Sequence, residues 1–159
     1  MQRGDRAPDF ELDDQFGNPT RLWNLIGTGP VVLFFFPAAM TFGCTRESCH
    51  FQDLREPLAA HGGQPVGVSR DSPDRLALFA KTYSLDFRLL SDRDGEVARR
   101  YGVLRRLASL PLRRTTFVIG ADLVILEVIA TELGFRQHAD RALGALAGGP
   151  KGKLQSGLT

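Results

Sequence analysis

The stretch that decides the fold runs from Val31 to Cys49 and reads VVLFFFPAAMTFGCTRESC, with both cysteines of the chain inside it. Its first six residues are apolar and rich in Val and Phe. A run of this length is too short for a helix and is typical of a strand buried on both faces. Pro37 ends the strand, because proline cannot donate a hydrogen bond to a β-ladder. We therefore expect a buried strand that leads directly to the cysteines.

A helix is expected to begin just after this strand, near Thr41 and Gly43. Cys44 then falls in or just before the first helical turn. A thiol at this place faces unpaired backbone N–H groups and the positive end of the helix dipole, and both favour the thiolate. Since the thiolate is the reactive form of cysteine, Cys44 is a candidate nucleophile.

The spacing of Pro37, Thr41 and Cys44 after an apolar strand resembles the active-site motif Pro-x-x-x-Thr-x-x-Cys of the peroxiredoxins. Cys49 follows five residues later in the pattern Cys-Thr-x-Glu-x-Cys, which resembles the bacterioferritin-comigratory or plant Q subgroup. Four segments match in the same order, which makes the likeness far more specific than Thr-x-x-Cys alone. Besides the cysteine stretch, these segments are Gly4–Phe10, Gly67–Pro73 and Arg114–Ile119.

The resemblance implies that Cys44 is the peroxidatic cysteine and Cys49 the resolving one. A free cysteine has a pKa of roughly 8.5 and needs help to ionise at neutral pH. By resemblance the helping cation is Arg114, three residues before Phe117, whose planar guanidinium can also hold a peroxide oxygen. The alternatives are that Arg113 has this role, or that Cys44 is only a small core residue.

Three further side chains complete the implied site. The hydroxyl of Thr41 would bond both the thiolate and the peroxide, or Thr41 would serve only as a helix cap. Pro37 would cover the site and limit the access of water. Glu47, one turn after Cys44, would accept a hydrogen bond from Arg114 and fix its orientation, or would be an ordinary acid of a first helical turn.

The implied activity is that of an atypical 2-Cys peroxiredoxin, a thiol-dependent peroxidase for hydrogen peroxide and organic hydroperoxides. Cys44 would attack a peroxide oxygen and become a sulfenic acid, releasing water or an alcohol. Cys49 would then form a disulfide with Cys44, which thioredoxin or a similar dithiol reduces, and no cofactor is required. The alternatives are a thiol–disulfide oxidoreductase, a class that usually carries Cys-x-x-Cys, and a redox sensor.

Composition is that of a soluble globular protein, with 43% hydrophobic and 24% charged residues. The net charge of +2 is too small to direct the chain to nucleic acid or a membrane. The three histidines show no ligand spacing, so no metal is predicted, and His50 is expected to face solvent. The N-terminus has no apolar signal region and no run reaches transmembrane length, so we expect a cytoplasmic protein, either a monomer or a weak homodimer.

Outside the cysteine stretch the chain alternates between predicted strands and helices. Residues 9–12 and 19–22 predict an N-terminal β-hairpin. Further strands are expected at 64–69, 87–90, 115–119 and 124–128, and helices after Cys44, Ser72 and Asp94 and across 139–146. The turn between the last two strands is too short for a crossover, so they should be antiparallel. The pattern predicts an α/β sandwich with a mixed central sheet, and the resemblance implies a thioredoxin-like three-layer sandwich.

At 159 residues the chain is expected to form one domain over 1–147, followed by a flexible tail over 148–159 that begins Gly-Gly-Pro-Lys-Gly-Lys. Pro57 lies inside the helix that should follow Cys44, and it predicts a kink or an early end. Trp23 and Phe42 are expected to serve in packing.

Overall fold

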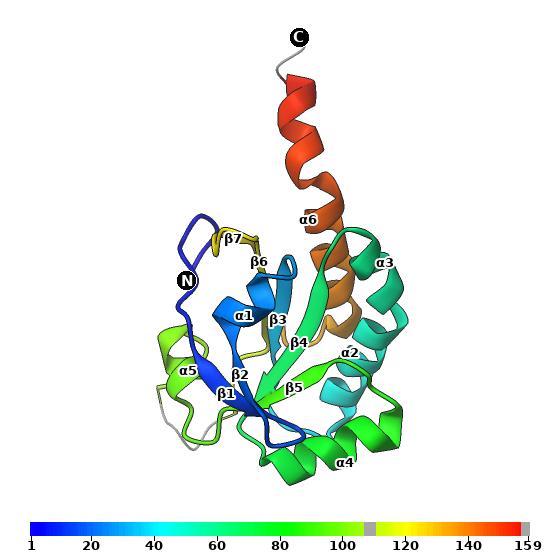
Figure 1. Cartoon of the computed structure of the whole chain (residues 1–159). Helices are drawn as coiled ribbons and strands as arrows, with labels where there is room; N and C mark the ends of the chain where they lie inside the picture. The colour runs from blue at the N-terminus through cyan, green and yellow to red at the C-terminus, as the bar shows by residue number, and fades with distance from the viewer. Residues whose placement is uncertain (107–110, 157–159) are drawn as a thin grey trace.

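The computed structural model describes residues 1–106 and 111–156 and contains a mixed sheet (Figure 1). The strands among these residues are β1 (Glu11–Asp14), β2 (Pro19–Arg21), β3 (Val31–Phe35), β4 (Gln64–Ser69), β5 (Arg88–Ser91), β6 (Thr115–Ile119) and β7 (Ile125–Ala130). They lie in the order β2-β1-β5-β4-β3-β6-β7. β3 pairs parallel with β4 and antiparallel with β6, and β6 pairs antiparallel with β7. The predicted hairpin, formed by β1 and β2, and the antiparallel final pair are confirmed.

Helices cover both faces of the sheet, which gives the three layers of a thioredoxin-like sandwich (Figure 1). They are α1 (Leu22–Ile26), α2 (Phe42–Asp53), α3 (Arg55–Ala60), α4 (Pro73–Tyr83), α5 (Glu96–Arg100) and α6 (Phe135–Ser156). Apolar residues of α1 and α5 belong to one hydrophobic core, and those of α2, α3, α4 and α6 belong to the other. The sheet separates the two cores.

β3 lies between the two cores, as its sequence predicts. Alternate side chains of a strand point to opposite faces. The first core therefore takes Val31, Leu33 and Phe35, and the second takes Val32 and Phe34. All five side chains are 0% exposed.

The helix after Cys44 ends early, as predicted from Pro57. α2 stops at Asp53 and α3 begins at Arg55, so Pro57 is the third residue of the new helix. Proline has no N–H to donate to the carbonyl four residues back, and its ring clashes with that carbonyl. Here that carbonyl belongs to Asp53, where α2 ends, whereas the N–H of Leu58 donates to Leu54 O at 2.9 Å.

Some sequence expectations differ from the structure. The short helix α1 was not predicted, because its five residues carry too little periodicity to be recognised. Trp23 and Phe42 were expected to pack, but they are 54% and 73% exposed. α6 continues past residue 148 to Ser156, and its last turns extend beyond the body of the fold (Figure 1). The flexibility of residues 148–159 stays a prediction, and 157–159 lie outside the described residues.

None of the helices in the described part of the chain is both long and apolar enough to cross a membrane.

Candidate active site

Cys44 is the third residue of α2 and is completely buried at 0% exposure. Thr41 is the N-cap residue of the helix, with extended backbone (φ −83°, ψ 157°), and its carbonyl oxygen accepts from Thr45 N at 2.9 Å. Its hydroxyl makes no capping bond to the helix and instead donates to Ala38 O at 2.7 Å. The hydroxyl oxygen therefore keeps lone pairs that can accept from an incoming peroxide.

Arg114 brings its guanidinium to Cys44 from the sheet. Its Nη1 and Nη2 atoms each lie 3.5 Å from Cys44 Sγ, and the residue is 7% exposed. It directly precedes Thr115, which pairs with Phe35 at the end of β3, so strand register carries it to the cysteine. Arg113, the residue before it, is exposed.

Two further contacts hold the Arg114 guanidinium in its orientation. Arg114 Nε donates to Glu132 O at 3.3 Å, and the guanidinium carbon lies 5.0 Å from the centre of the Phe135 ring. A cation over an aromatic face is attracted by the negative face of the ring. Because these contacts and Cys44 use different parts of the planar group, its two Nη atoms stay directed at the sulfur.

Glu47 lies one turn after Cys44 and is 0% exposed. Its Oε1 atom is 3.4 Å from Arg114 Nη1. Burial raises the pKa of Glu47 to about 8, and the attraction of Arg114 opposes this shift only in part. At neutral pH the carboxyl is therefore mostly protonated, and the positive charge of Arg114 stays available for a Cys44 thiolate.

His138 on α6 is a member of this cluster that the sequence analysis missed. Its Nε2 atom lies 2.9 Å from Thr131 O and 3.5 Å from Glu47 Oε2, and its Nδ1 atom lies 2.7 Å from Thr116 Oγ1. A carbonyl oxygen only accepts, so Nε2 carries the proton and Nδ1 accepts from the threonine hydroxyl. Burial lowers the pKa of His138 to about 4, so the ring is neutral. The available signal was its place beside Ala139 on the apolar stripe of α6.

Pro37 follows β3 and is half-buried in the loop that leads to Thr41. Within this loop Met40 has a φ of +68°, in the left-handed region. A non-glycine residue in a sparsely populated backbone region costs on the order of 1–3 kcal/mol and persists only where its surroundings hold it. The loop beside Cys44 is therefore strained and fixed in place.

Cys49 lies on the same helix, but the structure does not bring it to the cluster around Arg114. It is half-buried, both cysteines are free, and Cys49 borders a pocket with Arg46 and Arg136. Burial and, secondarily, the Asp53 carboxylate raise the pKa of the Cys49 thiol.

The neighbouring His50 was predicted to face solvent, and this was wrong. Its side chain is 11% exposed, and its Nε2 atom lies 2.7 Å from Asp140 Oδ1 on α6. Packing of α6 against α2 covers the ring, which no local pattern around Cys49 could indicate.

The family model described as the AhpC/TSA family matches residues 3–128. This chain belongs to the AhpC/TSA family. Its relatives are peroxiredoxins: it is 37% identical to the chloroplastic peroxiredoxin Q of Sedum lineare, over 90% of this chain and 76% of that protein. It is 36% identical to the peroxiredoxin Bcp of Escherichia coli, over 77% of this chain and 81% of that protein.

A solved structure of a related protein shows the same family and the same fold. The crystal structure of the peroxidoxin BcpB from Mycobacterium tuberculosis superposes with a TM-score of 0.89 at 49% identity, over 92% of this chain and 97% of that one. The predicted peroxiredoxin family and thioredoxin-like fold are therefore confirmed.

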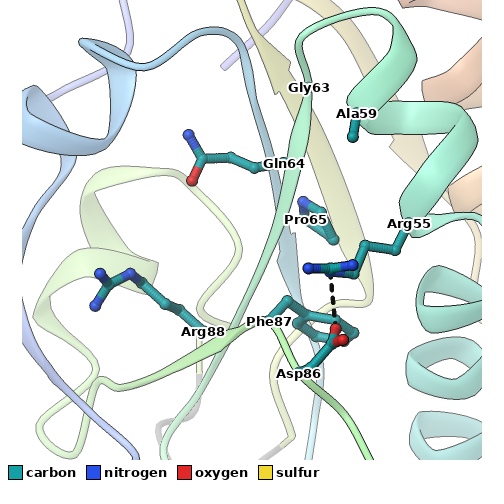
Figure 2. Close-up of a pocket in the computed structure, with 8 residues that line it drawn as sticks. All are labelled: Arg55, Ala59, Gly63, Gln64, Pro65, Asp86, Phe87 and Arg88. Atoms are coloured by element: carbon teal, nitrogen blue, oxygen red, sulfur yellow. Dashed lines mark ion pairs between the residues drawn. The ribbon is translucent and has the colours of Figure 1, made fainter.

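A pocket elsewhere on this peroxiredoxin lies between α3 and the strands β4 and β5 (Figure 2). Both of its arginines already have carboxylate partners: Arg55 Nε is 2.8 Å from Asp86 Oδ1, and Arg88 Nη1 is 3.1 Å from Asp14 Oδ2. None of the residues that line this pocket is a predicted site residue. The predicted site residues Cys44, Arg114 and Glu47 lie together in the buried cluster instead.

Proposed function

We propose that this peroxiredoxin reduces hydrogen peroxide and organic hydroperoxides with Cys44 as the peroxidatic cysteine. The observation that carries the proposal is the position of both Arg114 Nη atoms, 3.5 Å from a fully buried Cys44 Sγ. A guanidinium at this place stabilises the thiolate and can donate to a peroxide oxygen while negative charge develops on the leaving oxygen.

In the first step the Cys44 thiolate attacks one peroxide oxygen and the O–O bond breaks. The sulfur gains that oxygen and becomes a sulfenic acid, while the other oxygen takes a proton and leaves as water or an alcohol. Thr41 accepts from the peroxide O–H and orients it, and Pro37 limits the access of water. Glu47, as a neutral acid, orients the Arg114 guanidinium without competing for its charge.

In the second step Cys49 attacks the Cys44 sulfur, the S–O bond breaks, and water leaves as an intramolecular disulfide forms. Two electrons from thioredoxin or a similar dithiol then return both cysteines to thiols. The raised pKa of Cys49 keeps it protonated while α2 is intact. Opening of α2 would bring the Cys49 sulfur to Cys44 and would also relieve the burial that raises the pKa of the Cys49 thiol.

Disulfide exchange in the manner of a thiol–disulfide oxidoreductase fits this site less well. Such a reaction requires that the disulfide of a protein substrate reach the attacking sulfur, and Cys44 is 0% exposed. A hydroperoxide needs to bring only two oxygen atoms to the sulfur.

The cellular setting belongs to the same proposal. We infer a cytoplasmic enzyme that acts as a monomer or a weak homodimer, with a thioredoxin-type protein as reductant and no nucleic acid or membrane partner. The small net charge of +2 supports the absence of a polyanionic partner.

The test is turnover with thioredoxin, thioredoxin reductase and NADPH, with hydrogen peroxide and an organic hydroperoxide as substrates. We expect sustained peroxide-dependent NADPH oxidation and only slow reduction of insulin disulfides. Fast insulin reduction without peroxide turnover would instead assign the chain to thiol–disulfide exchange. Slow turnover with excess reductant, together with complete oxidation of Cys44, would indicate a sensor.

A further inference from the structure

The loop between β3 and α2 carries Pro37 and Thr41, and Ala39 lies midway between them. Both backbone polar groups of Ala39 are bonded to side chains from a distant part of the chain. Ala39 N donates to Asp71 Oδ2 at 2.8 Å, and Arg75 Nη2 donates to Ala39 O at 3.3 Å. The side chains of Asp71 and Arg75 therefore hold the loop at its central residue.

Asp71 is itself firmly held between β4 and α4. Its Oδ2 atom also accepts from Ser69 Oγ at 2.7 Å, and its carbonyl oxygen accepts from Ser91 Oγ at 2.7 Å. Its other carboxylate oxygen lies 3.2 Å from Arg75 Nε, and only 12% of the Asp71 side chain is exposed. Residues of β4 and β5 thus anchor Asp71, whose carboxylate binds the loop.

The backbone of the next residue, Met40, explains why the loop needs these two hydrogen bonds to Ala39. Met40 has a φ of +68°, which a non-glycine residue keeps only under external constraint. Thr41 follows in extended conformation and starts α2, and its hydroxyl is turned to Ala38 O, inside the same loop. A shift at Ala39 would therefore move the Thr41 hydroxyl and the entry of the helix together.

We propose that Asp71 and Arg75 are positioning residues for peroxide reduction, because together they hold Ala39 and so place Thr41 and Pro37 against Cys44. We call this pair the Asp71–Arg75 clamp. The inference rests on the proposed function, since it assigns the clamp to the peroxide-reducing step. Neither residue contacts Cys44 or Arg114 among the interactions of the described residues, so the clamp acts through the geometry of the loop.

The experiment measures the second-order rate constant for oxidation of Cys44 by hydrogen peroxide, by competition with a haem peroxidase. The variants are Asp71→Ala and Arg75→Met. Their matched controls are Asp86→Ala and Arg55→Met, which break a comparable ion pair of 2.8 Å in the remote pocket of Figure 2. Ultraviolet absorbance of the thiolate across pH is recorded for every variant.

We expect Asp71→Ala to slow the oxidation of Cys44 by about 10- to 100-fold, because small misplacements of substrate-orienting groups have effects of this size. Arg75→Met should slow it by roughly three- to tenfold, the effect of one ordinary hydrogen bond. Rate constants are expressed per Cys44 thiolate, so that a change in ionisation does not count as a change in positioning, and both controls should stay within about twofold of the wild type.

A Thr41→Val background separates positioning from a general structural effect. If the clamp acts through Thr41, the effect of Asp71→Ala should shrink sharply when the hydroxyl is already absent, whereas independent effects would multiply. Rate constants for both clamp variants equal to those of their controls would overturn the proposal, as would fully multiplicative effects with Thr41→Val. If Asp71→Ala fails to fold, Arg75→Met decides, because its side chain is 52% exposed. Absence of peroxide reduction by the wild type would overturn the proposed function, and this proposal with it.

Discussion

The two cysteines share helix α2 but lie in contrasting surroundings. Cys44, in the first turn, is 0% exposed and lies 3.5 Å from both Nη atoms of Arg114. Cys49, five residues further on, is half-buried beside a pocket, and burial together with Asp53 raises the pKa of its thiol. The folded helix therefore places one sulfur beside a buried cation and leaves the other away from it, at the edge of a pocket.

Helix geometry also keeps the two sulfurs apart. Five residues at a rise of about 1.5 Å and a turn of about 100° each place the two Cα atoms roughly 8–9 Å apart. A disulfide tolerates at most about 7 Å, so the bond requires that α2 open. The distal half of α2 is tied down at two points: His50 Nε2 lies 2.7 Å from Asp140 Oδ1, and Gln52 Oε1 accepts from Asp86 N at 3.0 Å. Opening that spreads past Cys49 would break these contacts.

The largest expected effect tests the assignment of the two sulfurs. Cys44→Ser should abolish peroxide reduction with any reductant, because it removes the nucleophile. Cys49→Ser should still consume one equivalent of peroxide per chain but should lose turnover with thioredoxin. Peroxide consumption and free-thiol counts measure both outcomes. Full turnover by Cys44→Ser would show that Cys44 is not the peroxidatic cysteine.

The second prediction concerns the cation that distinguishes Cys44 from Cys49. Arg114→Ala should lower the thiolate content of Cys44 and slow its oxidation by about 100- to 1000-fold, as for other lost donors at a developing charge. Arg113→Ala is the matched control, since this neighbour is exposed, and it should stay within about twofold of the wild type. A larger loss in the Arg113 variant would mean that the neighbouring arginine serves the site. Stopped-flow oxidation and ultraviolet titration decide between them.

The third prediction concerns the neutral acid beside Arg114. The folded pKa of Glu47, about 8, lies above its ordinary value of 4.5. The folded state therefore holds an extra proton between these values, and stability falls as pH rises through that window. The slope of the unfolding free energy from this group is up to about 1.4 kcal/mol per pH unit. Glu47→Gln should remove it.

Denaturation is best followed between about pH 6.5 and 7.5 in a Cys44→Ser background, where Cys44 does not titrate. His138 has the opposite effect at lower pH, since its folded pKa of about 4 lies below the ordinary 6.5 and stability is lost as pH falls between these values. Parallel pH profiles for the two Glu47 forms would contradict the assignment of Glu47 as a neutral acid.

The smallest expected effect concerns the contact between His50 and Asp140, which holds the distal half of α2. Asp140→Asn weakens the contact with His50, and disulfide formation after oxidation should become roughly two- to fivefold faster, the size of a part-exposed ion pair. Asp74→Asn, an exposed acid in the first turn of α4, is the control. Quenched-flow counting of free thiols measures the rate.

Hydrogen exchange gives the matching structural readout. Amides across 45–56 should exchange faster in the oxidised form than in the reduced form, and Asp140→Asn should narrow that difference by loosening the reduced form. Equal protection in both redox states, with the disulfide confirmed by mass, would show that the helix does not open.

Local sequence patterns were enough to predict most of the strands and helices and the central residues of the candidate site. The apolar run before Pro37 predicted β3, and the spacing around Cys44 identified the family. The family spacing to Phe117 selected Arg114 over Arg113, and the observed strand pairing carries its guanidinium to the sulfur. These features depend on neighbours in sequence or on one strand pairing.

The members that were missed depend on contacts between distant segments. His138 reaches Glu47 only because α6 packs against α2, and the same packing covers His50. Asp71 lies in a segment that resembles the family, but its grip on Ala39 requires the crossover from β3 to β4 to be known. Side-chain burial across two helices has no local signature, which explains these errors.

The proposed cycle opens part of α2 and rebuilds it, and Pro57 lies just beyond the end of that helix. Pro57 has no N–H to donate to Asp53 O, whereas Leu54 N donates to His50 O at 3.0 Å and Leu58 N donates to Leu54 O at 2.9 Å. Leu58 is 0% exposed and belongs to the same hydrophobic core as the apolar residues of α2, α4 and α6. Unwinding that starts at Cys49 therefore meets a missing hydrogen bond at Pro57 before it can spread through α3. Pro57 would thus limit the unwinding to α2, so that this helix can open and refold while the hydrophobic core remains packed.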